Sequence, residues 1–223
     1  MLINADFSVP ALVTPDDYRW VASPQAGVER VMLDRVGGEI ARATSLVRYA
    51  EGSIFPTHQH PGGEEILVLA GTFSDENGDY PAGWYLRNPP TSTHRPHSTY
   101  GALIFVKLHQ MLPTEDRTVR VNSMDAANWN VTGGRNICPL FEGGSELVYL
   151  ERLVDMAVLK MPSKDGIEVF VVSGMVSMGE KAYSKGSWIR LPENHHQAIH
   201  SIGAATVFVK TGPFPMAESL DVH

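Results

Sequence analysis

The sequence predicts an all-β protein built from two tandem copies of one β domain. Two observations support this fold class: short apolar runs recur along the chain, and the two halves match each other at a fixed offset. A third observation concerns function, because three histidines and one glutamate lie close together in the first half only. The 223 residues suffice for one large β domain or two small ones.

The expected strands are short runs rich in β-branched and aromatic residues, each bounded by Gly, Pro or Asn. The clearest runs span residues 66–70, 103–106, 169–172 and 206–209. They are too short for buried helices and lack a 3.6-residue period. We therefore expect each run to be a strand.

Helical signals are few. Thr14-Pro15-Asp16-Asp17 can begin a helix, because it combines a capping hydroxyl, an early proline and acidic residues near the positive end of the helix. Ser123-Met124-Asp125 can open a second short helical turn, since Trp129 follows it much as Trp20 follows Thr14. The polar stretch at residues 112–116 is the expected linker between the halves.

An internal repeat relates the two halves. A shift of 103 positions aligns identical residues in the pairs Glu65 and Glu168, Gly71 and Gly174, Gly83 and Gly186, Arg87 and Arg190, Pro89 and Pro192, and His97 and His200. The same shift places Phe105-Val106-Lys107 on Phe208-Val209-Lys210. Residues kept in both copies are expected to serve the fold, and residues found only in the first copy are expected to serve its chemistry.

Nearer the N-terminus the offset changes. The segment 31–35 resembles the segment 148–152 at a shift of 117. We therefore expect the second copy to be shorter by 117 − 103 = 14 residues and to lack the loop that carries His58 and His60. The expected domains are a metal-binding domain at residues 1–112 and a degenerate domain without metal ligands at residues 113–223.

The candidate metal ligands are His58, His60, Glu64 and His94. His58 and His60 are two residues apart, so in an extended strand their side chains leave the same face. Pro61-Gly62-Gly63 lets the chain turn before Glu64, and His94 can return on a neighbouring antiparallel strand. In the second copy Ile167 replaces Glu64 and Gln197 replaces His94, although His195 and His196 lie close to Gln197.

Three imidazoles and one carboxylate suit one divalent transition metal per chain, with zinc favoured and iron, manganese, cobalt or nickel as alternatives. The plainer interpretation is a group of surface histidines beside a charged turn. Glu65 is the alternative to Glu64 as the carboxylate ligand, but its counterpart Glu168 in the second copy favours a surface or ion-pairing role for Glu65. His97 is either an additional partner of the site or a structural residue, and its counterpart His200 favours the structural role.

Composition excludes several function classes. The net charge of −7, with no run of basic residues, argues against a nucleic-acid surface. The single cysteine, Cys138, excludes an internal disulfide and a cysteine-rich zinc module. The first six residues do not resemble a signal peptide, and the apolar runs are far shorter than the roughly 20 residues of a membrane helix. We expect a cytoplasmic protein with no membrane partner.

The string from Gly52 to Gly71, Gly-x5-His-x-His-x3-Glu-x6-Gly, matches the first motif of the cupin family, and Pro81-x-Gly83 with His94 resembles the second. The segments 63–71 and 80–89 are most similar to the cupin domain of ChrR-type anti-sigma factors. This resemblance implies two tandem cupin (RmlC-like jelly-roll) β-barrels, a bicupin with few short helices. It also implies zinc held by His58, His60, Glu64 and His94.

Three functions are compatible with these residues. The resemblance implies a regulatory or sensory protein of the oxidative-stress response, whose partner is a sigma factor, another regulatory protein or a small-molecule ligand. The sequence shows no counterpart of the separate His- and Cys-rich zinc domain with which that family binds sigma factors. The second function is a metal-dependent dioxygenase or isomerase that acts on a small organic acid or diketone. The third is a scaffolding bicupin, and a homodimer is compatible with each.

Coordination number separates the first two functions. Zinc held tetrahedrally by all four side chains leaves no open position and suits a structural or sensing site. Iron, manganese or nickel in six-coordinate geometry leaves two positions for substrate, water or dioxygen.

Overall fold

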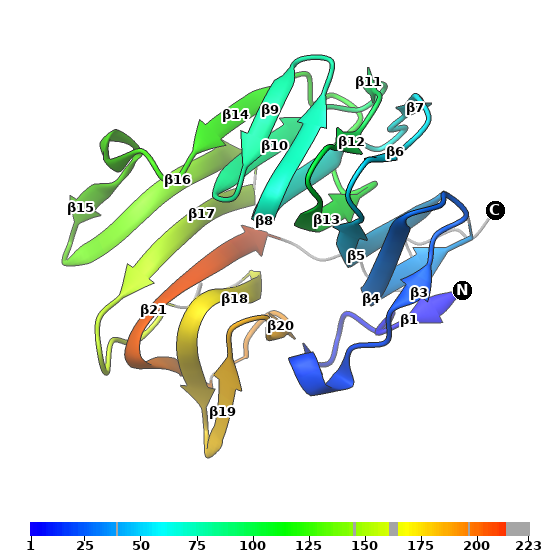
Figure 1. Ribbon diagram of the computed structural model, residues 1–223. Coiled ribbons are helices and arrows are strands. Elements are labelled where there is room, and N and C mark those ends of the chain that lie inside the picture. The colour runs from blue at the N-terminus through cyan, green and yellow to red at the C-terminus, as the bar shows by residue number, and fades with distance from the viewer. Residues whose placement is uncertain (39, 145, 161–164, 196, 213–223) are drawn as a thin grey trace. The chain divides into compact units, whose positions relative to one another are not determined.

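The computed structural model describes residues 1–223 except 39, 145, 161–164, 196 and 213–223 (Figure 1). The described residues form an all-β protein, as the sequence predicts, with strands throughout and two single-turn 3₁₀ helices. The four apolar runs lie in the strands Glu64–Asp75 (β8), Ala102–Leu108 (β13), Gly166–Met178 (β18) and Ile199–Gly212 (β21).

The chain divides into two compact units. Unit 1 comprises Met1–Ala5 and Arg19–Met124, and unit 2 comprises Asp6–Tyr18 and Asp125–His223. The chain therefore starts in unit 1, contributes a short segment to unit 2, and returns to unit 1 before it completes unit 2.

Unit 1 contains an antiparallel sheet with the strand order β1-β4-β5-β13-β8-β10-β14. The remaining strands of this path are β1 (Leu2–Ile3), β4 (Val28–Gly37), β5 (Ala41–Tyr49), β10 (Trp84–Asn88) and β14 (Val119–Asn122). Shorter strands join its margins: β3 (Val21–Ala22), β6 (Ser53–Ile54), β9 (Gly78–Pro81) and β12 (His97–Ser98). A separate two-stranded ladder joins β7 (His58–Gln59) to β11 (Thr93–His94).

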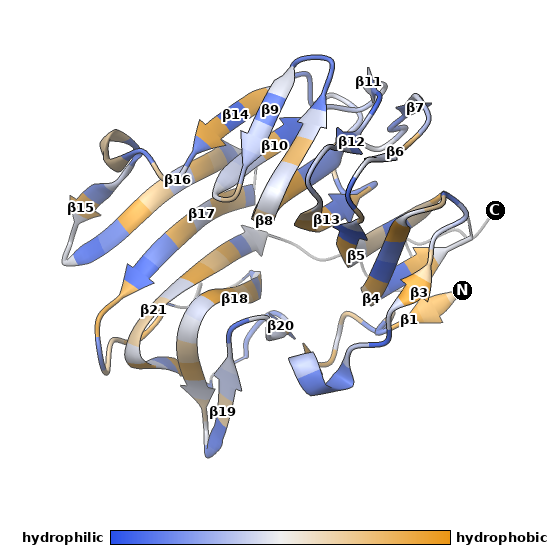
Figure 2. Cartoon of the chain, in the orientation of Figure 1, coloured by the Kyte–Doolittle hydropathy of each residue, from blue (hydrophilic) through white to orange (hydrophobic). Residues whose placement is uncertain are grey.

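Unit 2 repeats this order as β15-β16-β17-β21-β18-β20-β2. Its further strands are β2 (Ala11–Val13), β15 (Asn130–Thr132), β16 (Arg135–Gly143), β17 (Glu146–Leu153), β19 (Lys181–Ser184) and β20 (Trp188–Leu191). In both units the hydropathy of the strands changes along their length, and apolar residues recur in bands (Figure 2). This pattern is typical of strands with one or both faces buried.

The residues kept in both copies form equivalent cross-strand rows. In unit 1, Glu65 lies opposite Arg87 on one side and Lys107 on the other. In unit 2, Glu168 lies between Arg190 and Lys210 in the same way. All six side chains are buried. The repeat at an offset of 103 therefore preserves a row of buried charged residues. Of the two roles expected for Glu65, the ion-pairing role is confirmed and the surface role is wrong.

The second offset, 117, is wrong. Residues 31–35 lie in β4, whereas residues 148–152 lie in β17, which occupies the position of β5 because each pairs with the strand that carries the repeated Phe-Val-Lys segment. The connection from β5 to β8 spans residues 50–63 (14 residues), and that from β17 to β18 spans residues 154–165 (12 residues). The second copy has therefore not lost the loop; its loop has nearly the same length but carries no histidine. Adjacent strands of one sheet share composition, so a five-residue likeness cannot fix the register.

The structure draws the division between the units differently from residues 112 and 113. Beyond residues 112–116 the chain still forms β14, which pairs with β10 of unit 1. Conversely, β2 near the N-terminus pairs with β20 of unit 2. Each large sheet thus ends on a strand that comes from the other sequence repeat.

The two predicted helix starts are confirmed as short 3₁₀ turns. Thr14 caps Pro15–Asp17 through a reciprocal capping box with Asp17, and the Asp125 side chain accepts a hydrogen bond from Ala127 N ahead of Ala126–Asn128. Among the described residues, no helix is long and apolar enough to span a bilayer.

Candidate metal centre

A short ladder brings two of the candidate ligands face to face. His58 in β7 lies directly opposite His94 in β11, so the expected antiparallel return of His94 is confirmed. The hydrogen bonds His60 N to Ser92 O (2.9 Å) and Thr91 N to His60 O (2.8 Å) continue this pairing. His60 therefore stays on the same extended segment as His58, two residues away, with its side chain on the same face.

Glu64 reaches the site through a tight turn. Gly63 has φ = +76°, a backbone conformation that glycine adopts without strain. Its amide donates to His60 O at 3.2 Å, which closes the turn before β8 begins at Glu64. A side chain at Gly63 would also displace the flexible end of Met111, so the backbone conformation is the main reason for glycine here.

The four candidate ligands converge on one point. One ligand atom from each of His58, His60, Glu64 and His94 lies within 4.8 Å of the others, and three of the four residues are buried. His58 Nε2 and His60 Nε2 are 3.0 Å apart, and Glu64 Oε2 lies 3.6 Å from His60 Nε2 and 3.3 Å from His94 Nε2. Within the part of the chain that the structure describes, this is the group of side chains that could hold a metal ion.

Each imidazole has an oxygen atom within hydrogen-bonding distance of Nδ1, the ring nitrogen that points away from the other ligands. His58 Nδ1 lies 3.0 Å from Pro56 O, His60 Nδ1 lies 3.2 Å from Ser92 Oγ, and His94 Nδ1 lies 3.3 Å from Asp75 Oδ2. A proton on Nδ1 would satisfy these contacts and leave the Nε2 lone pairs directed inward. Such outer partners are typical of metal-binding histidines.

Glu64 is held by a hydrogen bond to the same oxygen that faces the histidines. Asn88 Nδ2 donates to Glu64 Oε2 at 2.9 Å, and Arg120 Nη2 donates to Asn88 Oδ1 at 2.6 Å. His94 Nε2 is buried without a hydrogen-bond partner. A buried, inward-facing nitrogen beside three further donors fits a divalent transition metal, which would satisfy all four at once.

Electrostatics differ between the two buried imidazoles. Burial lowers the pKa of His60, and the charge of Glu64 only partly offsets this effect. Burial also acts to lower the pKa of His94, but the hydrogen bond to Asp75 and the nearby charge of Glu64 outweigh it, so the pKa of His94 is raised. The carboxylates Glu64 and Asp75 therefore favour positive charge at this point, whether a proton or a metal cation supplies it.

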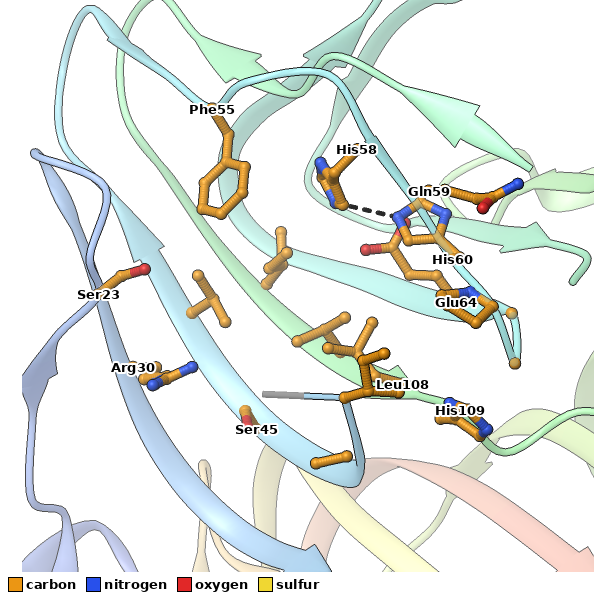
Figure 3. Close-up of a pocket in the computed structure, with 18 of the residues that line it drawn as sticks. Ser23, Arg30, Ser45, Phe55, His58, Gln59, His60, Glu64, Leu108 and His109 are labelled. Atoms are coloured by element: carbon orange, nitrogen blue, oxygen red, sulfur yellow. Dashed lines mark hydrogen bonds and ion pairs between the residues drawn. The ribbon is translucent and has the colours of Figure 1, made fainter. Parts of the chain in front are cut away.

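A pocket of about 420 Å³ opens beside this group. His58, His60 and Glu64 line one end (Figure 3), where Phe55 packs edge-on against the His58 ring with ring centroids 5.0 Å apart. The walls of the pocket are largely apolar and come from β4, β5 and β13; they include Val28, Val47, Tyr49, Ile104, Val106 and Leu108. A metal ion held by the four side chains would therefore face an open, largely apolar pocket.

The other histidines named from the sequence lie elsewhere. His97 in β12 pairs with Ile54 and Ser74 and is not one of the converging residues. The pairing of His200 with Ser177 repeats that of His97 with Ser74 at the offset of 103. The alignment that makes Gln197 the counterpart of His94 is therefore correct. His195 therefore does not take the place of His94, and His196 lies outside the described residues.

Sequence reasoning missed the partners that orient the ligands. Asp75 and Asn88 were not singled out, although the repeat carries the signal that would have found them. At the offset of 103, Asp75 corresponds to Met178 and Asn88 to Leu191. Both polar groups are thus replaced by apolar residues in the copy that lacks the ligands. His109, whose spacing from the other histidines gives no sign of a site, also lines the pocket beside the Pro61-Gly62-Gly63 turn.

Residues 8–112 match the family described as the ChrR cupin-like domain. This part of the chain is a ChrR cupin-like domain of the cupin superfamily. No curated protein matches the chain.

Several solved structures share the fold. A provisionally assigned dioxygenase from Nostoc punctiforme is 15% identical with a TM-score of 0.75, covering 92% of this chain and 83% of that protein. The bacterial pirin YhhW from Escherichia coli, solved with nickel(II), is 14% identical with a TM-score of 0.67, covering 92% of this chain and 100% of the pirin. A mutant of the oxalate decarboxylase OxdC from Bacillus subtilis is 12% identical with a TM-score of 0.63, covering 91% and 77% of the two chains.

Proposed function

We propose that the protein is a bicupin with two tandem barrels that binds one divalent transition metal, in unit 1, through His58, His60, Glu64 and His94. The proposal rests on the convergence of four donor residues, each of which also contacts a second partner that can orient it. Unit 2 supports no equivalent site, because Ile167 and Gln197 stand where Glu64 and His94 stand in unit 1. Zinc, iron, manganese and nickel suit this donor set.

The function that this site supports best is metal-dependent conversion of a small organic molecule, of the dioxygenase or isomerase type. The observation that carries it is the pocket, since three of the four donors line a cavity rather than a closed shell. When bound, the metal would supply a Lewis-acid centre with positions open to the pocket. The relatives of known structure include proteins described as a dioxygenase and an oxalate decarboxylase, which agrees with such chemistry.

The protein's own residues would position the substrate and exclude water. The apolar walls from β4, β5 and β13 would enclose the substrate's carbon body, and Phe55 would cover the exposed edge of His58. Asp75 and Asn88 would keep an imidazole and a carboxylate aimed at the same point, which fixes the geometry before substrate arrives.

A second candidate is a sensory protein of the anti-sigma factor type. The family match over residues 8–112 favours it, because that domain is described as ChrR cupin-like. In this case the pocket would bind a signalling molecule, and the partner would be a sigma factor or another regulatory protein. Zinc with four side-chain ligands would favour this candidate, whereas iron or manganese with open positions would favour catalysis.

Measurements of oxygen uptake and metal content distinguish the catalytic candidate from the sensory one. A dioxygenase transfers both atoms of O₂ to its organic product and needs no external reductant, so an oxygen electrode reports turnover of each organic acid or diketone supplied. An isomerase would convert substrate without oxygen uptake, which chromatography of the products would show. Turnover of either kind that disappears in His60→Ala supports catalysis; absence of turnover in fully metal-loaded protein rejects it in favour of the sensory candidate.

A further inference from the structure

The pocket also contains two arginines at a distance from the candidate metal ligands. Arg30 and Arg35, both on β4, line it together with Ser45 on β5. Figure 3 shows the Arg30 side chain across the pocket from His58, His60 and Glu64. This distribution gives the cavity a cationic end, an apolar middle and a metal-binding end.

Strand register sets the separation between the two ends. Glu64 on β8 lies opposite Leu108 on β13, Leu108 opposite Ala43 on β5, and Ala43 opposite Arg35 on β4. Three strand spacings therefore separate Glu64 from Arg35, which is ~14 Å along the sheet. The space between them is too wide for one small anion to touch both ends, but an organic molecule with an apolar body fits it.

The arginines have no carboxylate of their own among the described residues. Arg30 Nε is buried and lacks a hydrogen-bond partner, and Arg35 donates to the backbone oxygen of Gly38. The acidic residues nearest them along β4 pair elsewhere: Glu29 Oε2 lies 2.5 Å from Arg48 Nη2, and Asp34 Oδ2 lies 3.6 Å from Arg42 Nη1. Arg35 is buried and Arg30 is partly buried, with its Nε atom shielded from solvent. Positive charge that is partly withdrawn from water without an anion is unfavourable, so this part of the pocket is suited to bind an anion.

The two arginines also influence each other. Burial lowers the pKa of Arg35, and the positive charge of Arg30 lowers it further. Two positive charges that line the same pocket with apolar walls would both be stabilised by an organic anion bound there.

We infer that the pocket binds an organic carboxylate, with its carboxyl group at Arg30 and Arg35 and its apolar chain directed toward His58, His60 and Glu64. This inference adds a ligand class to the proposed function. It rests on the proposed function only for the end of the ligand that faces the metal site. It selects an organic acid over a neutral diketone as substrate or signal. Arginine suits this role because its planar guanidinium group can donate two parallel hydrogen bonds to one carboxylate.

Titration calorimetry with hexanoate and with its neutral isostere hexanamide tests this inference on the protein as purified. We expect hexanoate to bind about tenfold or more tightly than hexanamide, since hydrogen bonds to charged groups contribute more than neutral ones. Arg30→Met should remove this preference, and Arg35→Met should weaken it. Arg48→Met is the matched control and should leave it unchanged, because Arg48 lies on β5 outside this pocket.

The outcomes separate the inference from the proposed function. Equal affinity for hexanoate and hexanamide, no binding of hexanoate, or hexanoate binding that survives in Arg30→Met would overturn the inference. In the last case the carboxylate would be coordinating the metal, and the metal site would stand. Conversely, Arg30-dependent binding to protein without stoichiometric metal would support the inference and reject the proposed function. Thermal unfolding of each variant checks that it folds, and Arg30→Gln serves if Arg30→Met does not.

Discussion

At the scale of single residues, the outer partners of the ligands should matter almost as much as the ligands. Asp75 holds His94 through Nδ1 and is itself buried. We expect Asp75→Asn to lower metal affinity by about 10–100-fold, the usual effect of removing such a partner. Competition with a fluorescent metal chelator measures this affinity. An unchanged affinity would mean that Asp75 does not orient His94 in the loaded protein.

The ligands themselves give a sharper contrast. His60→Ala should abolish stoichiometric metal binding, whereas His200→Ala should retain it, because His200 is the counterpart of His97 and lies outside the converging group. Elemental analysis of both variants, purified without added metal, provides the measurement. Equal metal loss in the two would show that the contrast between the repeats does not identify ligands.

The single thiol gives a prediction about pH. Burial raises the pKa of Cys138 to about 11, above the value of an exposed thiol. Because the pKa is raised in the folded protein, the contribution of the buried thiol to the unfolding free energy is fully present at pH values below its unfolded pKa. This contribution is lost as the pH rises toward 11. Iodoacetamide labelling at pH 8 should therefore be slow in the folded protein and fast after denaturation. Rapid labelling of the folded protein would contradict the buried position.

At the scale of structural elements, the turn before β8 controls the position of Glu64. Gly63→Ala would combine a strained φ with a collision at Met111, so we expect lower stability and weaker metal binding. Gly52→Ala is the matched control: Gly52 has φ = +70° but open space around it. It should cost only about 1–2 kcal/mol of unfolding free energy, from backbone strain, and leave metal binding unchanged. Chemical denaturation and metal analysis distinguish the two effects.

The buried charged row is a second element-scale feature. Arg87 Nη1 lies 3.5 Å from Glu65 Oε2, with both side chains almost fully buried. We expect Arg87→Met to lower the unfolding free energy by about 3–5 kcal/mol, because it leaves the Glu65 carboxylate buried beside one cation fewer. The double variant Glu65→Met with Arg87→Met should not regain the stability lost in Arg87→Met, because it leaves the buried Lys107 without its neighbouring carboxylate. Urea unfolding tests this expectation, and a double variant as stable as the unmodified protein would refute it.

Sequence alone predicted the strands and the four converging residues, because both depend on local pattern. Short runs of β-branched and aromatic residues bounded by Gly, Pro or Asn identify β8, β13, β18 and β21, and the spacing of His58, His60 and Glu64 places three donors on one short segment. The pocket was not predictable, since Arg30 and Arg35 meet the site only through the register of four strands. The misplaced offset of 117 has the same cause, because register is a long-range property.

At the scale of the whole molecule, the repeat should be chemically asymmetric. The two units share a strand order, yet only unit 1 combines His58, His60, Glu64 and His94 with Asp75 and Asn88. We expect native mass spectrometry to find one metal ion per chain. Two ions per chain would show that unit 2 assembles a site from other residues.

The exchange of β2 and β14 between the two sheets has a consequence for biosynthesis. Unit 2 needs β2, which precedes nearly all of unit 1 in the chain, and unit 1 stays incomplete until β14 has been synthesised. A fragment ending at residue 112 would expose the free edge of β10, and one starting at residue 113 would expose that of β20, which invites aggregation. We therefore expect that neither sequence repeat folds stably when it is expressed without the other.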